Sequence, residues 1–373
     1  MFKIFFKSLI NLFKFINIEN KKKEFVFYSE SKYYRDYYID LIDNLKKLNQ
    51  KNIILITSDE TDELFFKDKL TCLLIKNYYI LSIFFKILDC KFMIMTLTDL
   101  GNHLQISKRC KFYIYYFHAM GSTHQIYTNA AFKNYNIIFS NGEYQSKELR
   151  LTEKKFNFPK KDIVNTGYFF LDNIKKKANL KLKENRNILF APSWNYNIKN
   201  LFDDYSLEII SNLLSNNFNL TLRPHPEHYK RSKNLIDKIK KIFSGNNNFY
   251  IDQNNSNLDS LEKAEILITD NSSIVFEFLL TFKRPIIYLD YTDKIHNVER
   301  DKIEISTIEN EFKNLFGNKL KISELKDLPS LCEKLIINTN LSNKSIEEFE
   351  KKYFSNLGNS AFFAANYLVK KSK

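Results

Sequence analysis

The chain has 373 residues, of which 44% are hydrophobic and 15% aromatic; this excludes a disordered chain and leaves room for two domains. Its formal net charge of +14 suits nucleic acid, anionic lipid or a phosphorylated substrate as partner, and a plain bias toward lysine would also produce it. The sequence has no RNA-binding signature, zinc finger or recognition-helix pattern, so we expect no nucleic acid partner. Only 7 glycines and 6 prolines disfavour a turn-rich all-β fold, and alternating strands and helices predict an α/β fold.

The cysteines and the apolar runs define the expected compartment. Cys72, Cys90, Cys110 and Cys332 lack the spacing of metal ligands, and we expect them to be buried thiols in a reducing compartment. No apolar run free of charges reaches about 18 residues, so no transmembrane span is predicted.

Residues 1–22 are predicted to form a basic amphipathic helix in a membrane interface. Apolar residues recur on one face at spacings of three and four, namely Phe2, Phe5, Phe6, Leu9, Phe13 and Ile16. Lys3, Lys7 and Lys14 lie at the other side or its border, which is typical of membrane-surface helices. A helix packed on the protein's own body is the alternative. A signal peptide would need a longer uncharged core and a cleavage site of small residues.

Residues 23–175 are predicted to form a first Rossmann-like domain. Helical periodicity is seen over 34–48, near Glu63 and over 80–88. Short apolar runs predict strands at 25–28, 52–57, 71–75, 92–97, 111–117, 136–139 and 162–165. Repeated strand–helix units of this kind indicate a doubly wound sheet.

The loop after strand 111–117 carries a cluster of chemically active residues. His118 comes directly after the strand, and Gly121 and His124 follow in a polar stretch. The carboxyl ends of strands are where α/β proteins place their chemistry, so we expect a functional role for His118. The alternative is that His118 and His124 are capping or surface residues.

Residues 186–345 are predicted to form a second Rossmann-like domain, after a charged linker that begins near residue 173. Its helices are expected at 207–214, 233–243, 258–263 and 274–282, and its strands at 188–191, 219–222, 249–251, 264–269 and 286–289. A capping box at Ser345 predicts a C-terminal helix over 346–373.

Two loops of the second domain are predicted to bind a diphosphate. The first runs from Asp270 through Asn271 and Ser272 to Ser273, between a buried strand and a helix. A helix N-terminus at a strand end is an anion site, because its N–H groups and dipole point the same way. The alternative is that these residues only cap the helix.

The second loop follows strand 219–222. It carries Arg223, His225 and His228, stiffened by Pro224 and Pro226. A guanidinium and imidazoles at one strand end, with hydroxyl and N–H groups at another, make a diphosphate pocket.

Several motifs in order resemble the CDP-glycerol glycerophosphotransferase family, the teichoic-acid-type polymerases and primases. They are APSW at 191–194, RPHP at 223–226, ITDNSS at 268–273, NTGYFFLD at 165–172 and KRPIIYLD at 283–290. The chain departs from the family pattern in the His118 loop, at Asn271 and at residues 169–170. The resemblance implies a GT-B fold, with two Rossmann-like domains that face a cleft. It also implies peripheral attachment to the cell membrane, and we expect a cytoplasmic protein on its inner face.

The resemblance implies transfer of glycerol phosphate, or a related alditol phosphate, from a CDP-activated donor to a hydroxyl of a cell-surface glycan or lipid-linked acceptor. His118, from the acceptor domain, and His225 would be catalytic, with His118 as the base. The donor-binding residues would be Arg223, Asp270, Asn271, Ser272, Ser273, Pro192, Ser193 and Gly167. Further candidates are His124, Glu277 and His228, with Glu277 either near the ribose or on an ordinary exposed face.

No metal site is predicted and no cofactor is expected, although Mg²⁺ could arrive with the diphosphate. Two other functions remain open. One is a GT-B glycosyltransferase that uses a CMP- or UDP-activated sugar in capsule or lipopolysaccharide synthesis. The other is an inactive scaffold that binds a membrane surface or a polyanion.

Overall fold

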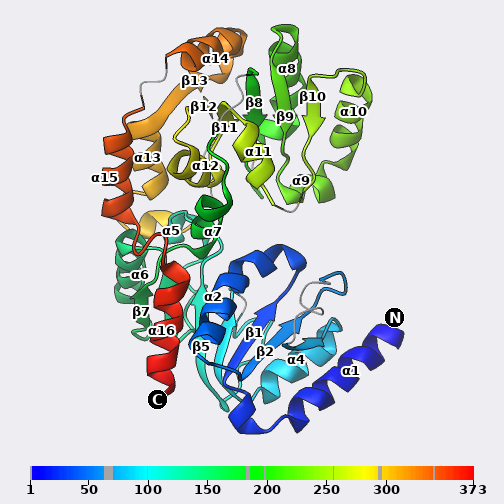
Figure 1. Cartoon of the computed structure of the whole chain (residues 1–373), viewed down its shortest axis with the longest axis vertical. Coiled ribbons are helices and arrows are strands. Elements are labelled where there is room, and N and C mark those ends of the chain that lie inside the picture. The colour runs from blue at the N-terminus through cyan, green and yellow to red at the C-terminus, as the bar shows by residue number, and fades with distance from the viewer. Residues whose placement is uncertain are drawn as a thin grey trace. The chain divides into compact units, whose positions relative to one another are not determined.

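The computed structural model describes residues 2–62, 70–98, 100–181, 185–196, 199–254, 256–292, 296–338 and 341–373. The chain divides into two compact units (Figure 1). Unit 1 comprises residues 1–120, 128–173 and 353–373. Unit 2 comprises residues 121–127 and 174–352.

Unit 1 is built on a seven-stranded parallel sheet with the strand order β3-β2-β1-β4-β5-β6-β7. The strands are β1 (Phe25–Ser29), β2 (Ile53–Thr57), β3 (Thr71–Leu74), β4 (Cys90–Met95), β5 (Cys110–Tyr116), β6 (Ile137–Ser140) and β7 (Asp162–Asn165). The order reverses between β1 and β4, as in a doubly wound Rossmann-like sheet. Its helices are α1 (Phe2–Asn17), α2 (Arg35–Lys47), α4 (Tyr78–Ile87), α6 (Glu143–Phe156) and α16 (Ser360–Ser372), with α7 (Phe169–Lys177) leading into unit 2.

The core of unit 1 is rich in aromatic side chains. Phe92 of β4 stacks between Phe25 of β1 and Phe112 of β5, with ring centroids 5.5 Å apart on each side. Helix α16 packs on α2 through the buried small residues Ala364 and Ala365. The last helix of the chain therefore completes the hydrophobic core of the first domain.

Unit 2 contains a six-stranded parallel sheet with the order β10-β9-β8-β11-β12-β13. The strands are β8 (Asn187–Phe190), β9 (Asn219–Leu222), β10 (Phe249–Ile251), β11 (Ile266–Thr269), β12 (Ile286–Asp290) and β13 (Gly317–Lys321). The helices are α5 (Thr123–Ile126), α8 (Leu201–Ser215), α9 (Pro226–Arg231), α10 (Lys233–Phe243), α11 (Leu258–Lys263), α12 (Ile274–Phe282), α13 (Ile308–Phe316), α14 (Leu328–Ile337) and α15 (Asn343–Tyr353).

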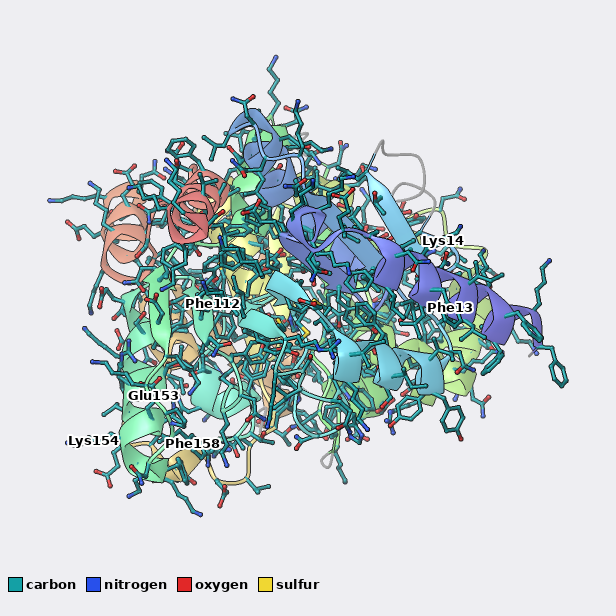
Figure 2. The ribbon with its side chains drawn as sticks, turned by 90° about the horizontal axis from the view of Figure 1, so that it is seen from below. Phe13, Lys14, Phe112, Glu153, Lys154 and Phe158 are labelled. Atoms are coloured by element: carbon teal, nitrogen blue, oxygen red, sulfur yellow. The ribbon has the colours of Figure 1, made fainter. Side chains whose placement is uncertain are left out.

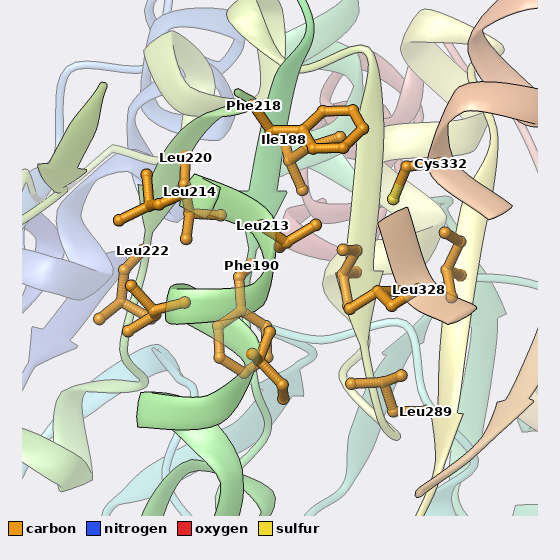
Figure 3. Close-up of a cluster of buried hydrophobic side chains, with 14 of the residues drawn as sticks. Ile188, Phe190, Leu213, Leu214, Phe218, Leu220, Leu222, Leu289, Leu328 and Cys332 are labelled. Carbon is orange, nitrogen blue, oxygen red and sulfur yellow. The ribbon is translucent and has the colours of Figure 1, made fainter. Parts of the chain in front are cut away.

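Figure 3 shows the core between this sheet and its helices, where leucines of α8, β9 and α14 surround Phe190 of β8. The structure confirms the predicted α/β class with two doubly wound parallel sheets. Strand β13 has no counterpart in the sequence-based prediction, since an edge strand with the sequence GNKLK lacks the apolar run of a buried strand.

The C-terminal region differs from the single helix expected over 346–373. It forms α15 and α16, and the chain between them adopts positive φ at Asn356 (49°) and Gly358 (86°). A residue with left-handed φ cannot continue a right-handed helix, so these two positions keep α15 and α16 separate. The helix expected near Glu63 falls on residues 63–69, which lie outside the described residues.

Within the described residues, no helix has the length and apolarity that crossing a membrane would require. Cys90, Cys110 and Cys332 are buried and Cys72 is partly buried, and all are free thiols.

Candidate donor pocket and catalytic histidine

The N-terminus of α12 forms the centre of the candidate site in unit 2. The helix is apolar, and all of its side chains from Val275 to Phe282 are buried, which fixes it against the sheet. Ser273 is the N-cap residue, yet its side chain accepts no hydrogen bond from the helix. A simple capping role therefore does not account for Ser273, and its half-buried hydroxyl lies at the positive end of the helix dipole.

Asp270 joins the ends of two neighbouring strands, β11 and β8. Its side chain is buried, and its two carboxylate oxygens accept hydrogen bonds from the backbone N–H (2.7 Å) and the hydroxyl (2.8 Å) of Ser193. Asn271 donates to the carbonyl of Thr292 at 2.9 Å. Asp270 thus positions the buried Pro192–Ser193 loop beside the α12 N-terminus.

Arg223 follows β9 and is held by a carboxylate that the sequence interpretation missed. Its guanidinium forms an ion pair with Asp252, whose side chain is 1% exposed and also accepts a hydrogen bond from the Ser260 hydroxyl. The Arg223 side chain is 18% exposed. The sequence shows only that an acidic residue, Asp252, comes directly after strand 249–251. Asp252 and Arg223 come together only because β10 pairs with β9.

The two histidines of this loop have different surroundings. His225 is the N-cap of α9, and its Nδ1 accepts a hydrogen bond from the Glu227 N–H at 3.2 Å. His228 is fully buried, and its Nε2 lies 3.1 Å from the Ser193 carbonyl. Since a carbonyl only accepts, Nε2 carries the proton. Burial lowers the pKa of His228, so it is a neutral residue that supports the Ser193 loop.

Glu277 is buried, which makes the expectation of an ordinary exposed face wrong. Its side chain is 9% exposed and accepts a hydrogen bond of 2.5 Å from the Asn257 side chain. Glu277 lies one turn into α12, on the same helix as Ser273. A buried carboxylate held by an amide is a fixed hydrogen-bond acceptor.

His118 belongs to unit 1 and follows β5. Its ring makes edge contacts with the rings of Tyr34 and Tyr37, with ring centroids 5.4 Å and 6.4 Å away. The Tyr168 hydroxyl donates a hydrogen bond of 3.0 Å to the His118 carbonyl. Burial among these aromatic rings lowers the pKa of His118 to about 4. The imidazole is therefore neutral at physiological pH and able to accept a proton.

The surroundings of two further predicted residues, Gly167 and His124, are defined within their own units. Gly167 is in unit 1 with a φ of +94°, and a Cβ there would lie 2.2 Å from the Ser355 carbonyl oxygen. This close packing, together with the positive φ, explains why glycine occupies position 167. His124 is buried in α5, and its carbonyl accepts a hydrogen bond from Asn297 at 2.8 Å.

Across the described ranges, no group of three or more His, Cys, Asp or Glu side chains could hold a metal ion. The arrangement offers hydroxyl groups, a helix N-terminus and a fixed guanidinium at the ends of strands β11, β8 and β9. Groups of these kinds are the ones that bind phosphate oxygens in other proteins.

Comparison with known proteins agrees with this chemistry. The sequence model of the family described as CDP-Glycerol:Poly(glycerophosphate) glycerophosphotransferase matches residues 108–324. The teichoic acid glycerol-phosphate primase of Bacillus subtilis (strain 168) is 25% identical over 190 residues, which are 48% of this chain and 47% of the primase. The minor teichoic acid biosynthesis protein GgaB of the same organism is 26% identical over 199 residues, 46% of this chain and 20% of GgaB.

The chain thus spans about half of the length of one curated relative and a fifth of the other. Among solved structures, that of the wall teichoic acid polymerase TagF is similar with a TM-score of 0.62 and 16% sequence identity. The match covers 100% of this chain and 98% of that one. It shows a shared fold and confirms the predicted GT-B assignment.

Proposed function

The chain belongs to the CDP-glycerol:poly(glycerophosphate) glycerophosphotransferase family, and we propose that it moves glycerol phosphate, or a related alditol phosphate, from a CDP-activated donor to an acceptor hydroxyl. The acceptor hydroxyl belongs to a cell-surface glycan or to a lipid-linked acceptor, and CMP is released. One observation carries the proposal. The loops that follow the neighbouring parallel strands β11, β8 and β9 carry Ser273, Ser193 and Arg223, so groups that can bind phosphate follow the carboxyl ends of adjacent strands of a single sheet.

The donor diphosphate would bind at the N-terminus of α12, where Ser272 and Ser273 supply hydroxyl groups and the helix supplies its dipole. Arg223 would stabilise the negative charge that develops on the leaving phosphate. Its ion pair with Asp252 holds the guanidinium in place before the donor binds. His225 already uses Nδ1 to cap α9, which assigns Nε2 to the phosphate.

Glu277 would accept hydrogen bonds from the ribose hydroxyls. Its anchoring by Asn257 supports this role, because a fixed acceptor loses little entropy when a ligand binds. Asp270 would act through Ser193 as a positioning residue, since both of its oxygens are already engaged there.

In the transfer step, the acceptor oxygen attacks the β-phosphorus of the donor and the bond from that phosphorus to the CMP oxygen breaks. His118 would take the hydroxyl proton. Its pKa of about 4 keeps it unprotonated before the substrates bind. Phosphoryl transfer needs positioning and charge stabilisation more than covalent help.

Attachment to an anionic membrane surface is part of the proposal and rests on helix α1. This helix packs on α4 and β3 through Ser8, Asn11, Leu12 and Phe15, and the Asn11 side chain donates to the Leu74 carbonyl at 2.9 Å. The side turned to the protein therefore contains polar residues. The opposite side exposes large apolar side chains.

We define the α1–α4 apolar surface by its exposed side chains, which are Phe2, Phe5, Phe6, Ile10, Phe13 and Ile16 on α1 and Tyr78, Tyr79 and Ile83 on α4. Exposed Lys3, Lys7 and Lys14 flank it, and Figure 2 labels Phe13 and Lys14 on α1. Apolar patches bordered by cations fit a bilayer with anionic headgroups. The inner face of the cell membrane is the proposed location.

The test combines ligand-dependent thermal stabilisation with measurement of nucleotide release. CDP-glycerol and CDP-ribitol are compared with CMP-sugars and UDP-sugars, each with Mg²⁺ and with a chelator. A ligand that binds the folded state raises the melting temperature by mass action. We expect stabilisation by CDP-alditols and CMP release when an acceptor is added.

The most informative variant is Ser272→Ala/Ser273→Ala. Arg223→Ala is less suitable, because it leaves the buried Asp252 carboxylate unpaired at a cost of about 3–5 kcal/mol. Ser244→Ala, on an exposed serine of the same unit, is the matched control. Stabilisation by nucleotide sugars alone would show glycosyl transfer instead, and no effect of any nucleotide would favour a scaffold.

A further inference from the structure

The loop that carries His118 is held within unit 1 by side-chain donors. Three successive carbonyls, those of residues 118–120, each accept a hydrogen bond from a side chain. The donors are the Tyr168 hydroxyl, the Asn141 amide and the Tyr144 hydroxyl. Because each carbonyl has a partner from the body of the unit, the backbone of this loop is restricted in its movement.

The chain then belongs to unit 2 for the short segment 121–127, which begins three residues after His118. Ser122, Thr123 and His124 in this segment are all buried. A buried segment needs hydrogen-bond partners for its backbone N–H and C=O groups. The partners that unit 2 supplies therefore determine the course of the chain directly after His118.

Ser122 and the first turn of α13 exchange two hydrogen bonds. The Ser122 N–H donates to the Glu309 carboxylate at 3.0 Å, and the Ser122 hydroxyl accepts from the Ile308 N–H at 2.9 Å. The first N–H groups of a helix have no partner within the helix, so Ser122 supplies one of them. The exchange is reciprocal, as in a capping box, although the paired residues are 187 and 186 positions apart in the chain.

The position of Glu309 in α13 suits it to hold a distant segment. The helix has its own N-cap, since the Thr307 side chain accepts from the Asn310 N–H at 3.3 Å. The Glu309 carboxylate reaches beyond the helix to the Ser122 N–H. A hydrogen bond to an ionised carboxylate is roughly twice as strong as one between neutral groups, so this bond is the strongest of the exchange.

Gly121 is explained by the same contact. A Cβ at this residue would lie 2.5 Å from the Glu309 oxygen that accepts from Ser122, and 2.3 Å from the Ile126 side chain. Any larger residue would displace the carboxylate oxygen from this place. Glycine at position 121 therefore leaves the room that the Glu309–Ser122 hydrogen bond requires.

Asn297 holds the two residues that follow in the buried segment. Its side chain donates to the His124 carbonyl at 2.8 Å, and its backbone N–H donates to the Gln125 carbonyl at 3.1 Å. Asn297 is itself buried. The segment after His118 thus has fixed partners in α13 and in the loop before it.

We propose that Glu309 is a positioning residue for His118. By fixing Ser122, it limits the backbone positions available to the imidazole when the acceptor hydroxyl loses its proton. The inference rests on the proposed function, in which His118 is the base, and it requires no contact of Glu309 with either substrate. A misplacement of about 1 Å at a reacting group can lower a rate about 100-fold, so a hydrogen bond four residues from the base can control turnover.

Glu309→Ala, Glu309→Gln and Gly121→Ala test the assignment, with Glu311→Ala as the matched control. Glu311 lies in the same turn of α13 and pairs with Lys352 at 3.5 Å. We expect Glu309→Ala to lower kcat about 10- to 100-fold, while stabilisation by CDP-glycerol stays as in the wild type. Glu309→Gln keeps an oxygen acceptor for the Ser122 N–H and should recover most of the turnover. Gly121→Ala should reproduce the loss, because its methyl group displaces the carboxylate.

Three kinetic or binding results would overturn the inference. The first is a Glu309→Ala turnover equal to that of the wild type, or an equal loss in Glu311→Ala. The second is a loss in Glu309→Gln as large as in Glu309→Ala, because charge and not the hydrogen bond would then matter. The third is weaker stabilisation of Glu309→Ala by CDP-glycerol, which would indicate a role in donor binding.

Hydrogen–deuterium exchange separates this inference from the proposed function. We expect the peptide that contains residues 121–127 to exchange faster in Glu309→Ala than in the wild type or Glu311→Ala, because the Ser122 N–H loses its acceptor. Unchanged exchange in Glu309→Ala would overturn the positioning role whatever the substrate is. Failure of CDP-alditols to bind any form of the protein would instead overturn the proposed function.

Discussion

Replacing two aromatic residues of the α1–α4 apolar surface should weaken membrane binding without unfolding the protein. Phe6 and Phe13 are 56% and 55% exposed, so their loss removes little packing from unit 1. Full burial of a Phe side chain contributes about 1.5–3 kcal/mol, and about half of each ring is available to the bilayer. The variant Phe6→Ser/Phe13→Ser should therefore lose about 1.5–3 kcal/mol of binding free energy, which corresponds to roughly 10- to 100-fold in vesicle affinity.

The assay is co-sedimentation with vesicles that contain anionic phospholipid, over a range of lipid and salt concentrations. Binding should fall as salt rises, because Lys3, Lys7 and Lys14 act through screened charge. The matched control is Ile242→Ser, which replaces a side chain of unit 2 that is 53% exposed and lies outside the surface. Unchanged affinity of Phe6→Ser/Phe13→Ser, or an equal loss in Ile242→Ser, would refute the reasoning.

Three further outcomes are expected. Asp252→Asn removes the anion from a buried ion pair and should lower the free energy of unfolding in urea by about 3 kcal/mol, whereas Asp259→Asn, in a mostly exposed pair, should change it by less than about 1 kcal/mol. His118 must be unprotonated to act as base, so with its pKa lowered to about 4 the acid limb of kcat/KM should lie below pH 5; a limb near pH 6.5 would contradict this role. Gly167→Ala meets both positive φ and the Ser355 carbonyl, whereas Gly358→Ala meets positive φ in open space, so differential scanning calorimetry should give the lower melting temperature for Gly167→Ala.

The interpretation of local sequence was reliable where a pattern is complete within one element. Strand β11 and helix α12 were predicted from an apolar run, a polar turn and a second apolar run, and both formed. Helices α10 and α11 agree with prediction to the residue. Such elements depend on periodicity and turn chemistry, which neighbouring residues supply.

Residues of the site were harder to interpret where their environment comes from distant strands. Asp252 lies 29 residues from Arg223, and nothing local marks it as the partner. The sequence left open whether Glu277 lies near the ribose or on an exposed face, and its buried hydrogen-bond partner, Asn257, is 20 residues away. Long-range contacts of this kind become visible only when the strand order is known.

Helix α1 illustrates both what local sequence predicts and what it leaves undecided. Its sequence predicted an apolar face bordered by lysines, and it also left open that the helix packs on the protein itself. In the structure, α1 packs through Ser8, Asn11, Leu12 and Phe15 and keeps its aromatic face exposed. Only tertiary contacts decide which side of a helix is covered, because helical periodicity defines the faces without defining the neighbour.

The sequence by itself determined the α/β class, the two sheets and the choice of candidate phosphate-binding residues, because these follow from short-range patterns and ordered motifs. The tertiary structure decided how those residues are held and what lies beside them. It paired Arg223 with Asp252 and engaged Asp270 with Ser193, and each of these pairs joins segments that lie far apart in the chain. Burial and hydrogen-bond partners depend on the strand order and on loops meeting in space, and that information is not contained in any single stretch of sequence.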